Sequence, residues 1–338
     1  AIITGGASGL GAAIAHRFAG EGAAVAVIDL PRMVERALAV VDELNGAGAE
    51  AYFVPGDVLD VDSIRGAIDQ AAAEMGGVDL CIASAGVAAH PDAGFRGLLD
   101  LDPDHFDFVN DVNVRGVFLT TQRAAQLMIA DGHGGSIVTL ASIAAKRPSA
   151  GVYSVSKAAV WMLTRSLAGE LAPHKIRVNA IGPAYVTTEM LAGIVSGAVG
   201  DDPVAQQAWY DQRAAQLPLG VLPSPLDIAN TALFLCSDEA ASFTGSPFAL
   251  TSAIMLLTTR TRTLSAISTW ISLSSTTLAT LPMIPPEVMI VSPRFTLATM
   301  SRCDFRRCCC GRMIRKYMIA KIATNGMSVT RKSPPPGW

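Results

Sequence analysis

Apolar, β-branched runs alternate with alanine-rich segments of helical length along the first 250 residues. The apolar runs predict strands at Ala1–Thr4, Ala24–Asp29, Ala51–Pro55, Leu80–Ser84, Ser136–Leu140 and Arg177–Gly182. The clearest helical segments, each with an apolar face, are Gly11–Glu21, Asp62–Met75, Phe106–Ala130 and Ser154–Leu171. Because the strands are apolar almost throughout, helices are expected on both faces of the sheet. The pattern predicts an α/β protein, a doubly wound parallel sheet with helices on both faces.

A glycine-rich turn joins the first predicted strand to the first predicted helix, over residues 4–11. Gly5 allows a tight turn, Gly9 lets the backbone approach a pyrophosphate, and Gly11 permits close packing of the helix. The N-terminus of that helix offers free N–H groups to phosphates. Glycine-rich turns also occur for structural reasons alone. The residues predicted to hold the phosphates of a dinucleotide are Gly5, Ser8, Gly9, Leu10 and Gly11.

An acid ends the second predicted strand, which favours the dinucleotide interpretation. The carboxylate of Asp29 can accept both hydroxyls of an adenosine ribose, and it would repel a 2′-phosphate, so it predicts NAD rather than NADP. The alternative is a solvated acid at a strand end. Arg32 would weaken the preference, although Pro31 is expected to turn it away. Asp57 and Val58 follow the third strand and are expected near the adenine, or Asp57 serves only a turn or helix cap.

A phenol and an ammonium group lie four residues apart at the start of the last predicted helix. At this spacing, Tyr153 and Lys157 leave the same helix face. A cation beside a phenol lowers its pKa, which predicts that Tyr153 is an acid/base group. A Tyr-x-x-x-Lys pair is usually an ordinary surface pair. The acid/base interpretation is favoured here by Ser142, which lies eleven residues upstream at a strand end. The Ser142 hydroxyl is placed to polarise a substrate carbonyl.

With the glycine turn, Asp29, Ser142, Tyr153 and Lys157 in this order, residues 1 to about 248 resemble the short-chain dehydrogenase/reductase family in its single-domain form, a Rossmann fold. The resemblance implies that Tyr153 exchanges a proton with the substrate oxygen, which Ser142 holds. It implies that Lys157 binds the nicotinamide ribose. Asn113 stands where the family has an asparagine, and the resemblance implies that it fixes a water in a proton relay.

Further segments match the family with some departures. The resemblance implies cofactor contacts after the fourth and sixth strands, at Ser84, Ala85, Gly86, Val186 and Thr188. A serine at position 84 replaces the family's asparagine and cannot span the same distance. Ala184 replaces a glycine, which would crowd the nicotinamide if that position required a positive φ.

Charge divides the chain near residue 250. Of 29 acidic residues 27 precede that point, whereas 12 of the 26 basic residues follow it, within a net charge of −3. We therefore predict a catalytic NAD-binding domain over 1–250 and an atypical basic extension over 251–338, either frameshifted or disordered. Cys81 and Cys236 lie singly in apolar stretches, which favours reduced thiols and a cytoplasmic protein. The chain opens directly on strand sequence without a signal peptide, as though trimmed.

The extension provides weak signals for other functions. Its charge-free run over 263–286 is long enough to cross a bilayer, but 10 of those 24 residues are Ser or Thr. Four crowded cysteines lack a histidine beside them, and the basic residues lack interleaved aromatics. The expectation is therefore no metal, no membrane and no nucleic acid.

The combined pattern predicts an NAD-dependent oxidoreductase that interconverts a secondary alcohol and a ketone. Substrate choice is expected to depend on the loop Val87–Leu101 and on Leu191–Leu217, whose apolar residues suit a hydrophobic or alicyclic substrate while its charged residues face water. His90 and His105 would contact a polar substrate or be bystanders. The resemblance implies a homodimer or homotetramer built through the helices Phe106–Ala130 and Ser154–Leu171. The alternative functions are a non-catalytic NAD-binding sensor or scaffold, and an epimerase or dehydratase acting through transient oxidation.

Overall fold

A computed structural model describes residues 1–92, 94, 96–147 and 150–249. Its centre is a seven-stranded parallel sheet in the order β3-β2-β1-β4-β5-β6-β7. The strands are β1 (Ile2–Thr4), β2 (Val25–Asp29), β3 (Ala51–Pro55), β4 (Leu80–Ala83), β5 (Gly135–Leu140), β6 (Ile176–Gly182) and β7 (Pro247–Ala249). The order reverses between β1 and β4, so the predicted doubly wound sheet is confirmed.

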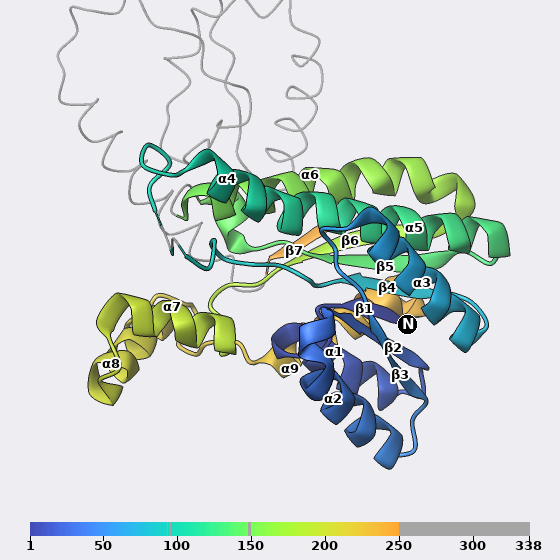
Figure 1. The fold of residues 1–338 in the computed structure, drawn as a ribbon, viewed down its shortest axis with the longest axis horizontal. Helices are drawn as coiled ribbons and strands as arrows, with labels where there is room; N and C mark the ends of the chain where they lie inside the picture. The colour runs from blue at the N-terminus through green and yellow to red at the C-terminus, as the bar shows by residue number, and fades with distance from the viewer. Residues whose placement is uncertain (93, 95, 148–149, 250–338) are drawn as a thin grey trace, which may run out of the picture. The chain divides into compact units, whose positions relative to one another are not determined.

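Helices cover both faces of the sheet, as predicted (Figure 1). One layer consists of α1 (Gly9–Ala19), α2 (Val34–Gly46) and α9 (Pro225–Cys236). The opposite layer consists of α3 (Val61–Met75), α5 (Gly116–Asp131) and α6 (Gly151–Leu171). The remaining α-helices are α4 (Pro103–Asn110), α7 (Glu189–Val199) and α8 (Pro203–Ala214). Short 3₁₀ turns lie at Pro31–Met33, Ile143–Lys146, Ala172–His174 and Asp238–Ala240.

Successive side chains of each strand point to opposite faces of the sheet, so the buried residues are divided between the two helical layers. On β1, Ile3 packs with the α1 side of the sheet, and Ile2 packs with the α3 side. Both side chains are fully buried, as is Phe18 of α1. Burial of both strand faces explains why the strands are apolar almost throughout.

Two elements differ from the sequence prediction. The predicted helix Phe106–Ala130 is interrupted by a π-helical turn, Asp111–Arg115, between α4 and α5. The strand β7 was not predicted, because its sequence departs from the family pattern. Its backbone pairs with β6, where Ala180 aligns with Pro247 and Ile181 with Phe248. Backbone pairing at a free sheet edge needs no particular side chains, which explains how β7 forms.

The predicted extension over 251–338, with its apolar run and its cysteines, lies outside the described residues. Among the helices that the structure describes, none is both long and apolar enough to cross a membrane. The same part of the chain contains no cluster of three or more His, Cys, Asp or Glu side chains suited to a metal ion.

Candidate active site

The predicted site residues come together at the carboxyl edge of the sheet. Because all strands run in parallel, the segments that follow β1, β4, β5 and β6 emerge at this edge, which Figure 1 shows beside α7. These segments carry the glycine turn, Ser84–Gly86, Ser142 and Val186–Thr188, respectively. The strand order reverses between β1 and β4, and these loops lie on both sides of that point. Parallel α/β sheets bind their ligands at this place.

The glycine turn has the backbone geometry that its sequence predicts. Gly5 has a φ of +67° and donates its N–H to the Ile28 carbonyl at 2.9 Å. A Cβ on Gly11 would lie 2.1 Å from the Gly5 carbonyl oxygen, so only glycine fits there. Gly9 has a φ of +54°, and no described atom beyond its neighbours lies within 4 Å of a Cβ placed on it. The start of α1 is thus open on the side where the backbone N–H groups of Gly9 and Leu10 begin the helix, which fits a pyrophosphate.

Asp29 is fixed against the glycine turn. Its carboxylate accepts the Ala7 N–H at 3.0 Å and the Leu30 N–H at 2.8 Å. These two bonds leave acceptor capacity on both oxygens, because each carboxylate oxygen has two lone pairs. The geometry fits ribose hydroxyls at the end of β2. Ser8 is the residue that precedes α1, and it makes no side-chain cap bond within the described chain.

Asp57 and Val58 have clear structural roles. The Asp57 carboxylate accepts the Leu59 N–H at 2.9 Å, a local turn bond, whereas the N-cap of α3 is Asp60. Val58 is buried against α5, where a Cβ on Gly116 would lie 2.8 Å from the Val58 Cβ. The turn interpretation of Asp57 accounts for these contacts, and its adenine contact stays a prediction.

Asn113 lies in the π-helical turn and is fully buried. Its side-chain amide holds both backbone groups of Val87: Nδ2 donates to the carbonyl at 2.8 Å, and Oδ1 accepts the N–H at 2.8 Å. Nδ2 also donates to the Ser156 Oγ at 3.0 Å. Both amide hydrogens are therefore used, and the side chain positions the segment after β4 against α6. The water relay stays a prediction.

Ser142 lies two residues after the end of β5, where it caps the 3₁₀ turn Ile143–Lys146, and it is buried. Its Oγ accepts the Ala144 N–H at 3.1 Å and lies 3.5 Å from the Pro183 carbonyl, to which it donates. Tyr153 lies in the first turn of α6 and keeps part of its side chain exposed. Burial of the phenol group raises the pKa of Tyr153, and its hydrogen bond with Ser142 acts in the opposite direction. The two hydroxyls thus form one interacting pair.

Lys157 is buried beside Tyr153, with Nζ 5.6 Å from the centroid of the tyrosine ring. Its Nζ donates to the Leu140 carbonyl at 2.8 Å, and burial lowers the pKa of Lys157 to about 8. The expectation that the lysine lowers the pKa of Tyr153 is wrong for this structure, because burial dominates and the pKa is raised. The spacing of the two residues does not reveal how strongly both groups are buried.

The segments after β4 and β6 complete the site. Ala85 donates its N–H to the Thr4 Oγ1 at 3.4 Å, and a Cβ on Gly86 would lie 3.4 Å from the Lys157 Nζ. The concern about Ala184 does not apply: among the described residues other than glycine, only Lys175 has a positive φ.

The two predicted residues after β6 differ in their surroundings. Val186 is buried in the core, where it packs with the α1 side of the sheet. Thr188 is the N-cap of α7 and accepts the Leu191 N–H at 3.3 Å. Thr188 therefore orders the start of α7, and its contact with the nicotinamide carboxamide stays a prediction.

Comparisons with known proteins agree with this geometry. Residues 5–250 match a family model described as enoyl-(acyl carrier protein) reductase. The chain is 38% identical over 247 residues to the 2,5-dichloro-2,5-cyclohexadiene-1,4-diol dehydrogenase of Sphingobium indicum, covering 72% of this chain and 91% of the relative. It is also 38% identical over 252 residues to the cis-4-hydroxycyclohexanecarboxylate dehydrogenase of Sinomonas cyclohexanicum, covering 74% and 94%. The chain belongs to the short-chain dehydrogenase/reductase family.

Solved structures of the family show the same fold. An NAD⁺-bound xylitol dehydrogenase matches with a TM-score of 0.67 and 28% identity, over 74% of this chain and 96% of that chain. An actinorhodin polyketide ketoreductase with NADPH matches with a TM-score of 0.68 and 30% identity, over 75% and 95%. The chain is therefore an oxidoreductase with the family's Rossmann fold and a nicotinamide cofactor site.

Two site features of this family member are absent from the sequence prediction. Ser156 is fully buried and links Asn113 to the start of α6, because its Oγ also donates to the Tyr153 carbonyl at 2.9 Å. The sequence prediction used only its neighbours Tyr153 and Lys157. A single serine between them gives no sign that it connects two elements. Arg213 of α8 was expected to face water, yet its guanidinium lies 4.6 Å from the Trp209 ring centroid. The i, i+4 spacing of Trp209 and Arg213 was the available signal.

His90 and His105 form a stacked pair beside the substrate loop. Their ring centroids are 4.1 Å apart, and His90 also meets the Phe108 ring edge at 4.8 Å. The His90 Nδ1 accepts the Asp92 N–H at 3.2 Å. The stack joins the loop after β4 to α4, so these contacts favour the bystander interpretation.

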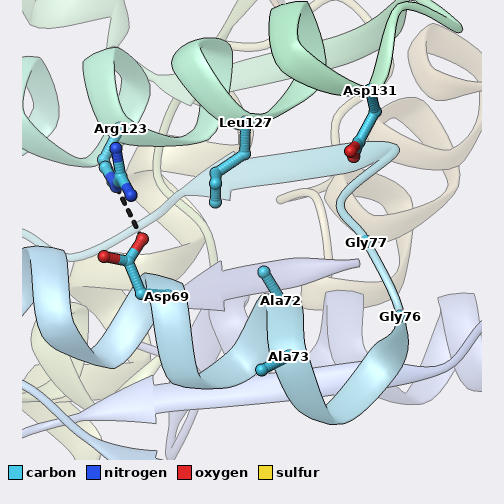
Figure 2. Close-up of a pocket in the computed structure, with 8 residues that line it drawn as sticks. All are labelled: Asp69, Ala72, Ala73, Gly76, Gly77, Arg123, Leu127 and Asp131. Atoms are coloured by element: carbon cyan, nitrogen blue, oxygen red, sulfur yellow. Dashed lines mark hydrogen bonds and ion pairs between the residues drawn. The ribbon is translucent and has the colours of Figure 1, made fainter.

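A hollow of about 410 Å³ lies at the opposite edge of the sheet (Figure 2). It is bounded by α3 and α5, where Arg123 Nε lies 2.6 Å from Asp69 Oδ1, and by the turn at Gly76 and Gly77 that leads into β4. Since β4 begins there, this hollow is separated from the candidate site residues by the length of the strand. It does not belong to the candidate active site.

Proposed function

We propose that the protein is an NAD-dependent dehydrogenase that interconverts a secondary alcohol and its ketone, with Tyr153 as the acid/base group. The observation that carries the proposal is the cluster of Ser142, Tyr153 and Lys157, in which Ser142 and Lys157 are buried and Tyr153 is partly exposed. In alcohol oxidation, NAD supplies the acceptor for the hydride that leaves the carbinol carbon. Tyr153, in its phenolate form, accepts the hydroxyl proton and becomes the neutral phenol, and the Ser142 hydroxyl orients the same oxygen.

Lys157 and Asn113 support that proton transfer. Lys157 donates to the Leu140 carbonyl, which fixes its Nζ beside the tyrosine ring. Its pKa of about 8 lets it share a proton with neighbouring groups near neutral pH. Asn113 holds Val87 and, through Ser156, the start of α6. Asn113 is therefore a positioning residue in this proposal, and the predicted water relay extends it.

The preference for NAD rests on Asp29. The carboxylate is held by the N–H groups of Ala7 and Leu30, so it cannot easily turn away from a 2′-phosphate. Placing phosphate beside this fixed negative charge is unfavourable. Arg32 lies in the 3₁₀ turn that begins at Pro31 and is exposed, so it offers the 2′-phosphate little compensation.

Substitution of Asp29 tests the preference for NAD over NADP. Asp29→Ser keeps a hydroxyl for the ribose and removes the charge. We expect the ratio of kcat/KM for NAD over NADP to fall by about 10- to 100-fold, because a hydrogen bond to a charged group contributes about 1.5–3 kcal/mol. Asp42→Asn, on the exposed side of α2, is the matched control and should leave the ratio unchanged. An unchanged ratio in Asp29→Ser would remove the basis for the NAD preference.

For the substrate we propose an alicyclic secondary alcohol. Two relatives are named for the oxidation of hydroxylated six-membered carbon rings. The aromatic residues of α8 and of the segment before α7 suit such a ring. The alternative of a non-catalytic NAD-binding module has no supporting observation in the described residues, because Ser142, Tyr153 and Lys157 are all present. The same intact set does not favour the epimerase or dehydratase alternative.

We also infer a homodimer or homotetramer in the cytoplasm. Helices α5 and α6 expose large apolar residues, namely Phe118, Ile129, Val155 and Met162, which suits contact between copies. Burial raises the pKa of the Cys81 thiol to about 12 and that of Cys236 to about 11. Such thiols stay protonated and unreactive, which supports their interpretation as reduced core residues.

A further inference from the structure

An aromatic cluster lies between α8 and the segment that follows β6. The rings of Tyr185 and Trp209 meet edge to face with centroids 5.5 Å apart, and Trp209 meets Tyr210 in the same way at 5.8 Å. The Arg213 guanidinium lies over both Trp209, at 4.6 Å, and Tyr185, at 5.6 Å. A cation over two ring faces is held in place by their negative quadrupoles. The cluster therefore presents a fixed guanidinium.

Arg213 has no carboxylate partner among the residues that the structure describes. Its Nε is buried and unbonded, and its Nη1 donates only to the neighbouring Gln212 Oε1 at 3.3 Å. The acids that are closest in sequence are engaged elsewhere: Asp202 caps α8, Asp201 accepts from Ser196, and Asp211 accepts from Gln207. A partly buried guanidinium without an anion is costly, because burial of a charge is compensated mainly by pairing.

The cluster adjoins the catalytic residues through Pro183. The Pro183 carbonyl accepts from Ser142 Oγ at 3.5 Å and from the Ile143 N–H at 3.0 Å. Tyr185 follows two residues later, so its Cα is within about 7 Å of that of Pro183. Arg213 contacts the Tyr185 ring, so it is anchored to the same segment that Ser142 contacts at Pro183.

We propose that Arg213 binds a carboxylate on the substrate, with Tyr185 and Trp209 as aromatic walls for the ring that carries it. The substrate class is then an alicyclic hydroxy acid or the matching keto acid. This inference rests on the proposed dehydrogenase function and specifies its substrate. Guanidinium suits this task because its planar N–H groups match the two oxygens of a carboxylate. The carboxylate supplies the counterion that the described chain does not provide.

Matched substrates test the proposal. We would measure kcat and KM for cis-4-hydroxycyclohexanecarboxylate and for its uncharged carboxamide, with the full-length protein and NAD. Wild type should favour the acid by about 10- to 100-fold in kcat/KM, as expected for a charge-assisted hydrogen bond. Arg213→Gln should abolish this preference by raising KM for the acid. Arg213→Lys should restore part of it, and Arg165→Gln, on the exposed side of α6, should behave as wild type.

The outcomes separate this inference from the proposed function. Turnover with an acid-to-amide ratio that Arg213→Gln does not change would overturn the carboxylate site and leave the dehydrogenase proposal standing. If neither compound is turned over, calorimetric titration with cyclohexanecarboxylate and cyclohexanecarboxamide decides the question. Carboxylate binding that is lost in Arg213→Gln, with an unchanged melting temperature, would support the site. Equal binding of both probes, or no binding of either, would contradict it.

Discussion

Lys157 shows how single residues acquire their properties from burial. Its ammonium is enclosed by protein and donates to the Leu140 carbonyl, and burial lowers its pKa from 10.5 to about 8. The sequence identified Lys157, Tyr153 and Ser142 from spacing alone, because i, i+4 positions share a helix face. The lowered pKa that it predicted for Tyr153 was wrong, because the pKa is raised by desolvation, which depends on the whole fold.

The lowered pKa predicts how Lys157 affects stability as the pH changes. Below about pH 8 the lysine is charged in the folded and unfolded states, and burial of the charge costs stability. Between about pH 8 and 10.5, the unfolded state retains a proton that the folded state releases, so the free energy of unfolding rises with pH. Relative to Lys157→Met, wild type should gain about 2 to 3 kcal/mol across this window.

Urea unfolding of both proteins between about pH 7 and 10 measures this gain. Subtracting the free energy of unfolding of the variant from that of wild type removes the pH dependence that Cys81, Cys236 and other shared groups contribute. A difference that stays flat, or falls, as pH rises would show that the ammonium is not desolvated as the structure implies.

The hardest single residues to predict were those whose roles depend on contacts with other side chains. Ser156 has no motif of its own, and its role follows from the bonds that it makes with Asn113 and with the Tyr153 carbonyl. Arg213 was assigned to solvent because charged residues usually face water. Only the contact with Trp209 and Tyr185 reveals otherwise.

At the scale of elements, the junction of β1 and α1 depends on close packing between its own glycines. A methyl group on Gly11 would meet the Gly5 carbonyl at 2.1 Å, which the backbone cannot avoid without moving. We expect Gly11→Ala to lower the free energy of unfolding by about 1–3 kcal/mol, a typical cost of overpacking. It should also weaken NAD binding, because the same turn would hold the pyrophosphate.

Gly66→Ala provides the control for this prediction. Gly66 lies inside α3, and no described atom lies within 4 Å of a Cβ placed there. Alanine should therefore stabilise the protein by about 0.5–1 kcal/mol through helix propensity. Equal effects of the two substitutions, measured by thermal unfolding and by NAD titration, would contradict the packing argument.

Element boundaries were predictable where local chemistry sets them. The strands β1 to β6 were found because most of their residues are buried and apolar. The π-helical turn at Asp111–Arg115 was missed, since an apolar face continues across it without a break in the pattern. The strand β7 was missed because its own sequence gives no strand signal. It is defined by backbone hydrogen bonds to β6, and the Ala180 N–H donates to the carbonyl of Ser246, just before β7, at 3.1 Å.

For the whole molecule, parallel strand direction assembles the site. Residues 5, 29, 113, 142 and 153 are distant in sequence, and the sheet order brings their segments to one edge. The fold class could be predicted because alternating strands and helices allow few other arrangements. Side-chain contacts across that edge, such as the Asn113 amide on Val87, could not be predicted, since they depend on the exact placement of loops.

The most direct test of the central claim is NADH formation from cis-4-hydroxycyclohexanecarboxylate and a panel of other secondary alcohols by the full-length protein, beside Tyr153→Phe. Phenylalanine keeps the ring and removes only the hydroxyl that exchanges the proton. We predict NAD-dependent turnover in wild type, a loss of at least about 100-fold in kcat for the variant, and unchanged NAD affinity in calorimetry. Equal turnover by the two proteins, or tight NAD binding with no turnover of any alcohol by wild type, would contradict the account.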